Sequence, residues 1–76
     1  MNKLRRARLN AVINSVYELK TEVEAIKDEE EDAKENLPES LQSSNMYDIM
    51  EESVDNMDSA IDSIDDVIGY LEGAMG

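Results

Sequence analysis

The sequence predicts an all-α fold, an antiparallel two-helix coiled-coil hairpin, and three observations carry that prediction. Apolar residues recur at alternating steps of three and four in two segments, which is the spacing that aligns side chains along one side of a helix. The one proline, Pro38, stands between these segments. The 76 residues include only three aromatic side chains, all Tyr, which supply a compact globular core poorly. We therefore expect a single domain, residues 1–76, built as one hairpin.

The apolar rows place the two helices at about residues 3–35 and about residues 45–73. The row of the first helix consists of Leu9, Val12, Val16, Leu19, Val23, Ile26, Glu30, Ala33 and Leu37. The row of the second helix consists of Tyr47, Met50, Val54, Met57, Ile61, Ile64, Ile68, Leu71 and Met75. Each row repeats for four heptads, so we expect the two helices to pack along their whole length.

The loop is expected at residues 36–44, where proline, serine and asparagine gather. Pro38 disfavours helical geometry at Leu37 and so ends the first helix. Ser44 or Asn45 is expected to cap the second helix, because a short polar side chain there accepts a free backbone N–H. A loop this short requires the chain to return antiparallel.

Charged residues beside the apolar rows predict how the helices pair. With Leu9 and Tyr47 at heptad position a, the e row of the first helix is nearly all basic and that of the second is all acidic. These rows face each other in an antiparallel coiled coil, so we expect ion pairs that set the orientation. The e residues are Arg6, Ile13, Lys20, Lys27 and Lys34 in the first helix and Glu51, Asp58, Asp65 and Glu72 in the second.

The second helix is also apolar beyond its a and d rows. Its g row, which is small or apolar, consists of Met46, Ser53, Ala60, Val67 and Ala74. An apolar helix face left uncovered usually packs against another helix, so we expect a homodimer that forms a four-helix bundle, or burial on another protein. The residues expected at the oligomer interface are Ala60, Val67, Ala74, Ile13 and Tyr70.

Composition argues against an enzyme. The absence of Cys and His excludes thiolate chemistry, disulfides, imidazole acid–base steps and the usual zinc sites. A two-helix hairpin has no concavity large enough to raise the pKa of a carboxyl group or to exclude water. The calcium-loop pattern is also missing. We therefore expect no catalytic residue, no cofactor and no metal site.

Charge and hydropathy limit the partners and the location. The chain opens with four bases, Lys3, Arg5, Arg6 and Arg8. A net charge of -12 repels nucleic acid elsewhere, so we expect these bases to pair within the chain and expect no direct nucleic-acid binding. The apolar runs are too short for a membrane span or a signal peptide, so we expect a cytoplasmic protein without membrane contact.

Acidic residues are concentrated in the second half of the chain, where residues 36–76 contain ten acids and no base. Five acids of the second helix are expected to point to solvent, namely Asp48, Glu52, Asp55, Asp62 and Asp66. A long, rigid ridge of one sign suits docking into the basic groove of a nucleic-acid-binding protein. The alternative is a solvated face on an acidic protein.

Residues 36–42 (NLPESLQ), followed by the heptad segments 54–58 (VDNMD) and 61–65 (IDSID), resemble small acidic proteins of phages and mobile elements of Gram-positive gut bacteria. The resemblance carries over no activity and no binding residue. It implies an inhibitor of host-defence or nucleic-acid enzymes, such as an anti-CRISPR or DNA-mimic protein that docks a host-defence nuclease. The alternative function is a structural or assembly adaptor that acts through the apolar helix face.

Overall fold

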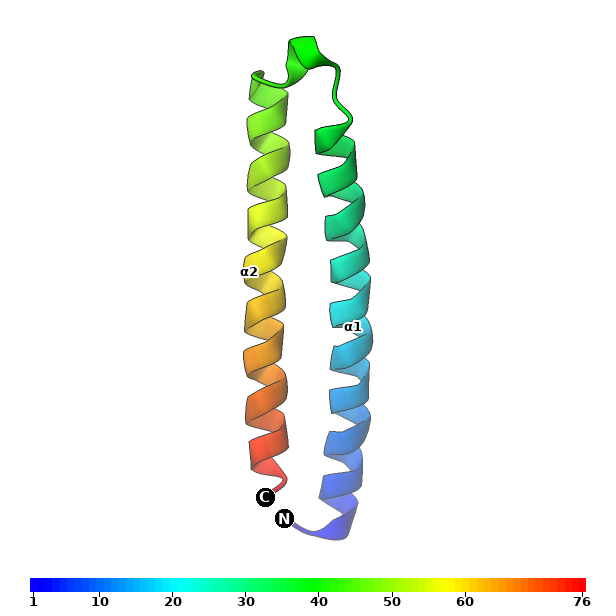
Figure 1. Cartoon of the computed structure of the whole chain (residues 1–76). Helices are drawn as coiled ribbons and strands as arrows, with labels where there is room; N and C mark the ends of the chain where they lie inside the picture. The colour runs from blue at the N-terminus through cyan, green and yellow to red at the C-terminus, as the bar shows by residue number, and fades with distance from the viewer.

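The computed structural model describes residues 1–76 and consists of two long helices joined by a short loop (Figure 1). Helix α1 spans Lys3–Glu35, a 3-10 turn, η1, spans Glu39–Leu41, and helix α2 spans Asn45–Ala74. The helices lie side by side and antiparallel, so both chain ends are at one end of the molecule and η1 is at the other (Figure 1). The helical hairpin that the heptad rows predict is confirmed.

Each helix begins at a polar side chain that accepts a backbone N–H. The Oδ1 of Asn2 accepts the N–H of Arg5 at 2.8 Å, at the start of α1. The Oγ of Ser44 accepts the N–H of Tyr47 at 3.4 Å, at the start of α2. Ser44 is thus the cap of α2, one of the two residues expected there. Both side chains satisfy donors that have no partner within the helix.

The loop is held by backbone hydrogen bonds around Pro38 and by one side chain. The Pro38 carbonyl accepts the N–H of Leu41 at 2.7 Å, which closes η1. The side-chain amide of Gln42 donates to the carbonyl of Leu37 at 2.8 Å and to that of Glu35 at 3.4 Å. These bonds satisfy carbonyl groups that the end of α1 leaves free, so the reversal of the chain is a defined turn.

The seam of α2 consists of the a and d residues that the sequence predicts. Val54 and Ile68 are buried, and the remaining members of the row are half-buried. Every third or fourth residue of α2 therefore faces α1, as the heptad pattern requires.

Helix α1 is rotated relative to the seam expected from its sequence, and this corrects the prediction for its d row. The d residues Val12, Leu19, Ile26 and Ala33 are exposed. Apart from Glu31, which follows the row at position b, the residues of α1 that are buried or half-buried come from the a and e rows: Leu9, Ile13, Val16, Lys20, Val23, Lys27, Glu30 and Lys34. Rotation places Ile13 in the core and lays the lysine stems along α2, where the ammonium groups of Lys20 and Lys27 reach its acids.

Two helices alone cover little apolar surface. Only Ile13, Val54 and Ile68 are buried. The molecule measures 60 × 15 × 11 Å and exposes 5534 Å², whereas a compact protein of this mass exposes about 4,700 Å². The hairpin therefore has a single seam and a large remaining surface, on which any functional site must lie.

Candidate functional site

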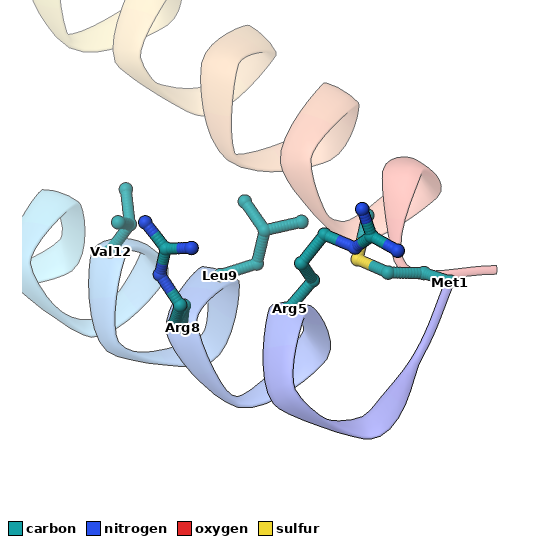
Figure 2. Close-up of a pocket in the computed structure, with 5 residues that line it drawn as sticks. All are labelled: Met1, Arg5, Arg8, Leu9 and Val12. Atoms are coloured by element: carbon teal, nitrogen blue, oxygen red, sulfur yellow. The ribbon is translucent and has the colours of Figure 1, made fainter.

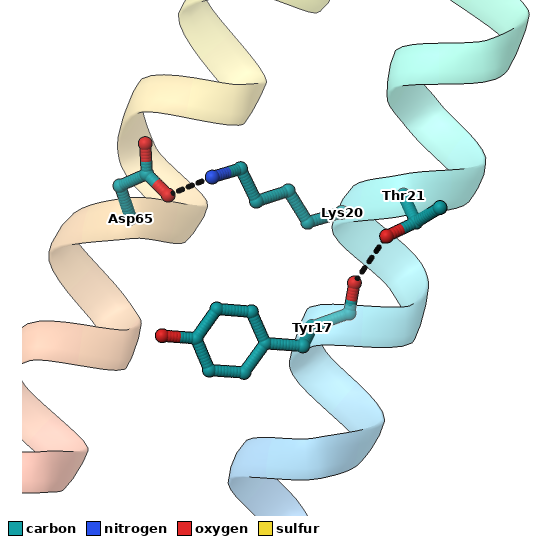
Figure 3. Close-up of polar contacts among 4 residues, drawn as sticks. All are labelled: Tyr17, Lys20, Thr21 and Asp65. Atoms are coloured by element: carbon teal, nitrogen blue, oxygen red, sulfur yellow. Dashed lines mark hydrogen bonds and ion pairs between the residues drawn. The ribbon is translucent and has the colours of Figure 1, made fainter.

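Two ion pairs connect the helices along one side of the seam. The Nζ of Lys20 lies 2.6 Å from the Oδ1 of Asp65, and the Nζ of Lys27 lies 2.8 Å from the Oδ1 of Asp58. Figure 3 shows Lys20 reaching from α1 across to Asp65 on α2, with the ring of Tyr17 nearby on the same helix. The expected pairing of the e rows is therefore found at these two positions.

The ion pairs change the proton affinity of both lysines. The hydrogen bond to Asp65 raises the pKa of Lys20 above its ordinary value of 10.5, against a smaller opposing effect of desolvation. The hydrogen bond to Asp58 raises the pKa of Lys27 in the same way. Both ammonium groups are thus held in the charged form, and the pairs fix the register of α1 on α2.

The other bases do not pair with acids, which corrects the expectation that the basic opening is neutralised within the chain. Lys34 lies over the ring of Tyr47, with its Nζ 5.4 Å from the ring centroid. Arg6 donates from Nε to the carbonyl of Met75 at 3.3 Å, at the end of α2. Arg5 and Arg8 have no carboxylate within 4.0 Å. The end of α2 lies near these two guanidinium groups and consists of glycines and uncharged residues, with Glu72 as its one acid.

The five acids that sequence analysis assigns to partner binding form an acidic ridge on α2. Asp48, Glu52, Asp55, Asp62 and Asp66 are all exposed, and none has a basic group within 4.0 Å. All five belong to the b and f rows, which lie away from the seam. With Asp58 and Asp65 taken by lysines, α2 keeps one free carboxylate per ~5 Å of its axis, compared with one charge per ~3.4 Å along a DNA strand.

A second surface, the apolar face, was not predicted in this form. It consists of Val12, Leu19, Ile26 and Ala33 from α1 and Met46, Ser53, Ala60, Val67 and Ala74 from α2. Leu19 is 62% exposed, and Val12, Ile26, Met46 and Val67 are each 45–53% exposed. Sequence reasoning placed the α1 members in the seam. The signal that could have found them was Ile13, because an apolar e residue offers the helix an alternative seam.

Helix geometry places these two rows on the same side of the hairpin. Each residue turns an α-helix by about 100°. Leu19 therefore points away from the side on which Lys20 meets Asp65, and so does Val67, which follows Asp65 by two residues. In the register that the ion pairs set, Leu19 lies across the seam from Val67, and Ile26 lies across it from Ala60. The hairpin thus has an ion-paired side and an apolar side.

The residues expected at the oligomer interface separate into two groups. Ala60, Val67 and Ala74 belong to the apolar face, and Tyr70 is exposed next to it on α2. Ile13 is 6% exposed and lies in the seam between the helices, so it is corrected from a surface residue to a core residue. The rotation of α1 brings Ile13 inward and turns its neighbour Val12 outward.

The one concavity of the molecule lies at the basic end of the apolar face. It is a shallow depression of about 350 Å³ lined by Met1, Arg5, Arg8, Leu9 and Val12 (Figure 2). Its polar groups are two guanidinium groups, and no carboxylate or hydroxyl lines it. This lining suits an anionic group, and it provides no general base or nucleophile.

Other classes of site have no counterpart in the structure. No group of three or more carboxylates is arranged to hold a metal ion. Neither helix has a stretch apolar and long enough to cross a bilayer. Comparisons of the chain with family models, with curated proteins and with solved structures gave no match. The fold and the two surfaces thus define a class, an acidic helical hairpin with an acidic ridge and an apolar face.

Proposed function

We propose that this protein is a non-enzymatic interaction module whose acidic ridge docks onto a basic surface of another protein. The observation that carries the proposal is that all five ridge carboxylates are exposed and unpaired, while α2 has no basic residue to neutralise them. A nucleic-acid-binding protein offers a surface of this kind, because its groove is lined by bases that already hold phosphates.

The rigidity of the ridge supports this assignment. The ridge lies on a continuous 30-residue helix whose opposite side is packed against α1. Its carboxylates therefore have fixed spacing and lose little conformational freedom on binding, which favours affinity. A phage-type inhibitor or DNA mimic that occupies the nucleic-acid channel of a host-defence nuclease is the specific role that we propose for such a ridge.

The test compares two variants of equal charge. The ridge variant carries Asp48→Asn, Asp55→Asn, Asp62→Asn and Asp66→Asn. The control variant removes four exposed acids from α1 by Glu22→Gln, Glu24→Gln, Asp28→Asn and Glu35→Gln. Each variant is immobilised, basic proteins are captured from a bacterial lysate, and each captured protein is then assayed for duplex binding with and without the hairpin.

We expect the wild type and the control variant to capture a protein whose duplex binding the hairpin blocks. We expect the ridge variant to lose that protein, and about 0.5 M salt to release it from the wild type, since exposed charge pairs are screened within a few ångströms at high salt. Equal loss in both variants would mean that total charge, and not the ridge, is responsible. Retention at high salt would contradict docking through the ridge.

A second candidate function, a structural or assembly adaptor, is favoured by the apolar face. Such an adaptor would associate through Ala60 and Val67, and the association would tolerate salt because apolar burial does not depend on charge. Ala60→Glu or Val67→Glu would abolish it, whereas the ridge variant would leave it intact. Capture with these variants in the same assay separates the two functions.

A further inference from the structure

The apolar face lacks charge along its whole α2 side. The exposed c row of α2, Ile49, Asn56, Ser63 and Tyr70, borders the apolar face, and neither this row nor the g row contains a charged residue. All nine acids of α2 belong to the b, e and f rows. A helix this acidic that is solvated on every exposed side would carry acids around its circumference. The segregation indicates that the uncharged side is covered by another surface.

The surface that the hairpin exposes beyond that of a compact protein is about as large as an interface. The chain exposes 5534 Å², which is roughly 800 Å² more than a compact protein of its mass exposes. A standard protein interface covers about 800 Å² on each partner. The apolar face runs for ~30 Å along both helices.

The charges that border the α1 side of the face are arranged in opposite signs at its two ends. Arg5 and Arg8 lie at the open end of the hairpin, where they line the depression and have no acid partner (Figure 2). Glu29, which belongs to the same g row as Arg8, and Asp32, a c residue, lie near the loop, are exposed and have no basic partner. Leu19 lies near the middle of the hairpin. Along the sequence, Arg8 precedes Leu19 by 11 residues and Glu29 follows it by 10.

We propose that the apolar face is covered by a second copy of this chain, with the ends reversed. A two-fold axis perpendicular to the helices passes near Leu19, so α1 packs antiparallel on α1 of the second copy and α2 on α2. This arrangement places Arg8 opposite Glu29, brings Asp32 to the depression beside Arg5, and aligns the two hairpins over their whole length. Each bridge occurs twice because the interface is isologous.

The alternative two-fold axis, parallel to the helices, lacks this match. It would set α1 against α2 of the second copy, so that Arg5 and Arg8 face an uncharged helix side and remain unpaired. Charge complementarity between the two ends of α1 therefore selects the reversed arrangement.

Sedimentation equilibrium on the full chain tests whether the dimer exists. We expect the wild-type chain to be a dimer at about 100 µM. Leu19→Glu should raise the dissociation constant of the dimer at least about 100-fold, because two facing carboxylates, one from each copy, would replace two buried leucines. Tyr17→Glu is the matched control, since Tyr17 is an exposed apolar residue of the same helix on the ion-paired side. A monomeric wild type, or equal dissociation in both variants, would overturn the proposal.

Cross-linking tests the orientation without disturbing the fold. The chain has no cysteine, so single cysteines can be introduced. With a short thiol cross-linker, Leu19→Cys is expected to cross-link to itself across the axis. Val12→Cys and Ile26→Cys are each expected to give no product alone and a cross-linked dimer when mixed. Cross-linking of Leu19→Cys to Val67→Cys, with none of the expected products, would overturn the reversed arrangement.

A charge swap tests the bridges. Arg8→Glu and Glu29→Arg are each expected to weaken the dimer about tenfold, since each removes two bridges and creates two like-charge contacts. The double variant with both changes is expected to restore the wild-type dissociation constant. Additive weakening in the double variant would contradict the pairing of Arg8 with Glu29.

Discussion

Lys20 and Asp65 are joined at 2.6 Å between Nζ and Oδ1, and this contact shows how α1 is oriented on α2. The side chain of Lys20 is 24% exposed, so most of its stem lies against the partner helix while its ammonium group reaches the acid. A lysine in this position moves Leu19, its neighbour, to the outside. The pair therefore determines both the register of the hairpin and the composition of its apolar face.

The two lysine pairs predict an alkaline loss of stability. Because the pKa of Lys20 and of Lys27 is higher in the folded chain than the ordinary value of 10.5, the pairs stabilise the fold below that pH. Their contribution is lost as the pH rises through the folded-state pKa. Thermal unfolding followed by circular dichroism should show a falling midpoint above about pH 10.5. The double variant Lys20→Met, Lys27→Met should lack this component, and an identical alkaline decline in both proteins would contradict it.

The rotation of α1 predicts opposite outcomes for two apolar residues. Ile13 is 6% exposed, so Ile13→Ala should lower the free energy of unfolding by about 2 kcal/mol. Leu19 is 62% exposed, so Leu19→Ala should change it by less than about 0.5 kcal/mol. Urea unfolding measures both, at a concentration low enough for the chain to be monomeric. A larger loss for Leu19 than for Ile13 would mean that the seam of α1 is the a and d row.

The cap of α2 predicts a local effect at the loop. Ser44 accepts the N–H of Tyr47, so Ser44→Ala should cost about 1 kcal/mol and shorten the helix at its start. Ser43→Ala is the matched control, because Ser43 is exposed and no hydrogen bond from its side chain is found. Hydrogen exchange of the first turn of α2 should increase only in the Ser44 variant. Equal exchange in the two variants would exclude the capping role.

Gly69 predicts a gain in stability. A Cβ added at this position meets nothing within 4 Å, and the residue belongs to the b row, outside the apolar face. Gly69→Ala should therefore raise the free energy of unfolding by about 0.5–1 kcal/mol, since alanine loses less backbone freedom in a helix. Chemical denaturation provides the measurement. A loss of stability or of dimer would show that a neighbouring chain approaches this glycine closely.

The candidate surfaces were predictable to different degrees. The acids of the ridge were recognisable because b and f residues point away from a seam built of a and d residues, as in α2. The pairing of Lys20 and Lys27 followed from the opposite signs of the two e rows. The α2 half of the apolar face was predictable, because its members are g residues that lie outside the a and d seam. The α1 half was not, because its members are d residues, which a heptad pattern assigns to the core.

The sequence by itself determined two helices, the turn between them and the seam of α2, because heptad spacing, capping residues and a proline act locally along the chain. Only the tertiary structure decided which side of α1 meets α2. The a and d rows and the a and e rows of α1 each form a continuous stripe, so spacing cannot choose between them. In the folded hairpin the a and e rows of α1 pack on α2, because this arrangement buries Ile13 and brings Lys20 and Lys27 to their acids. Val12, Leu19 and Ile26 therefore remain on the surface.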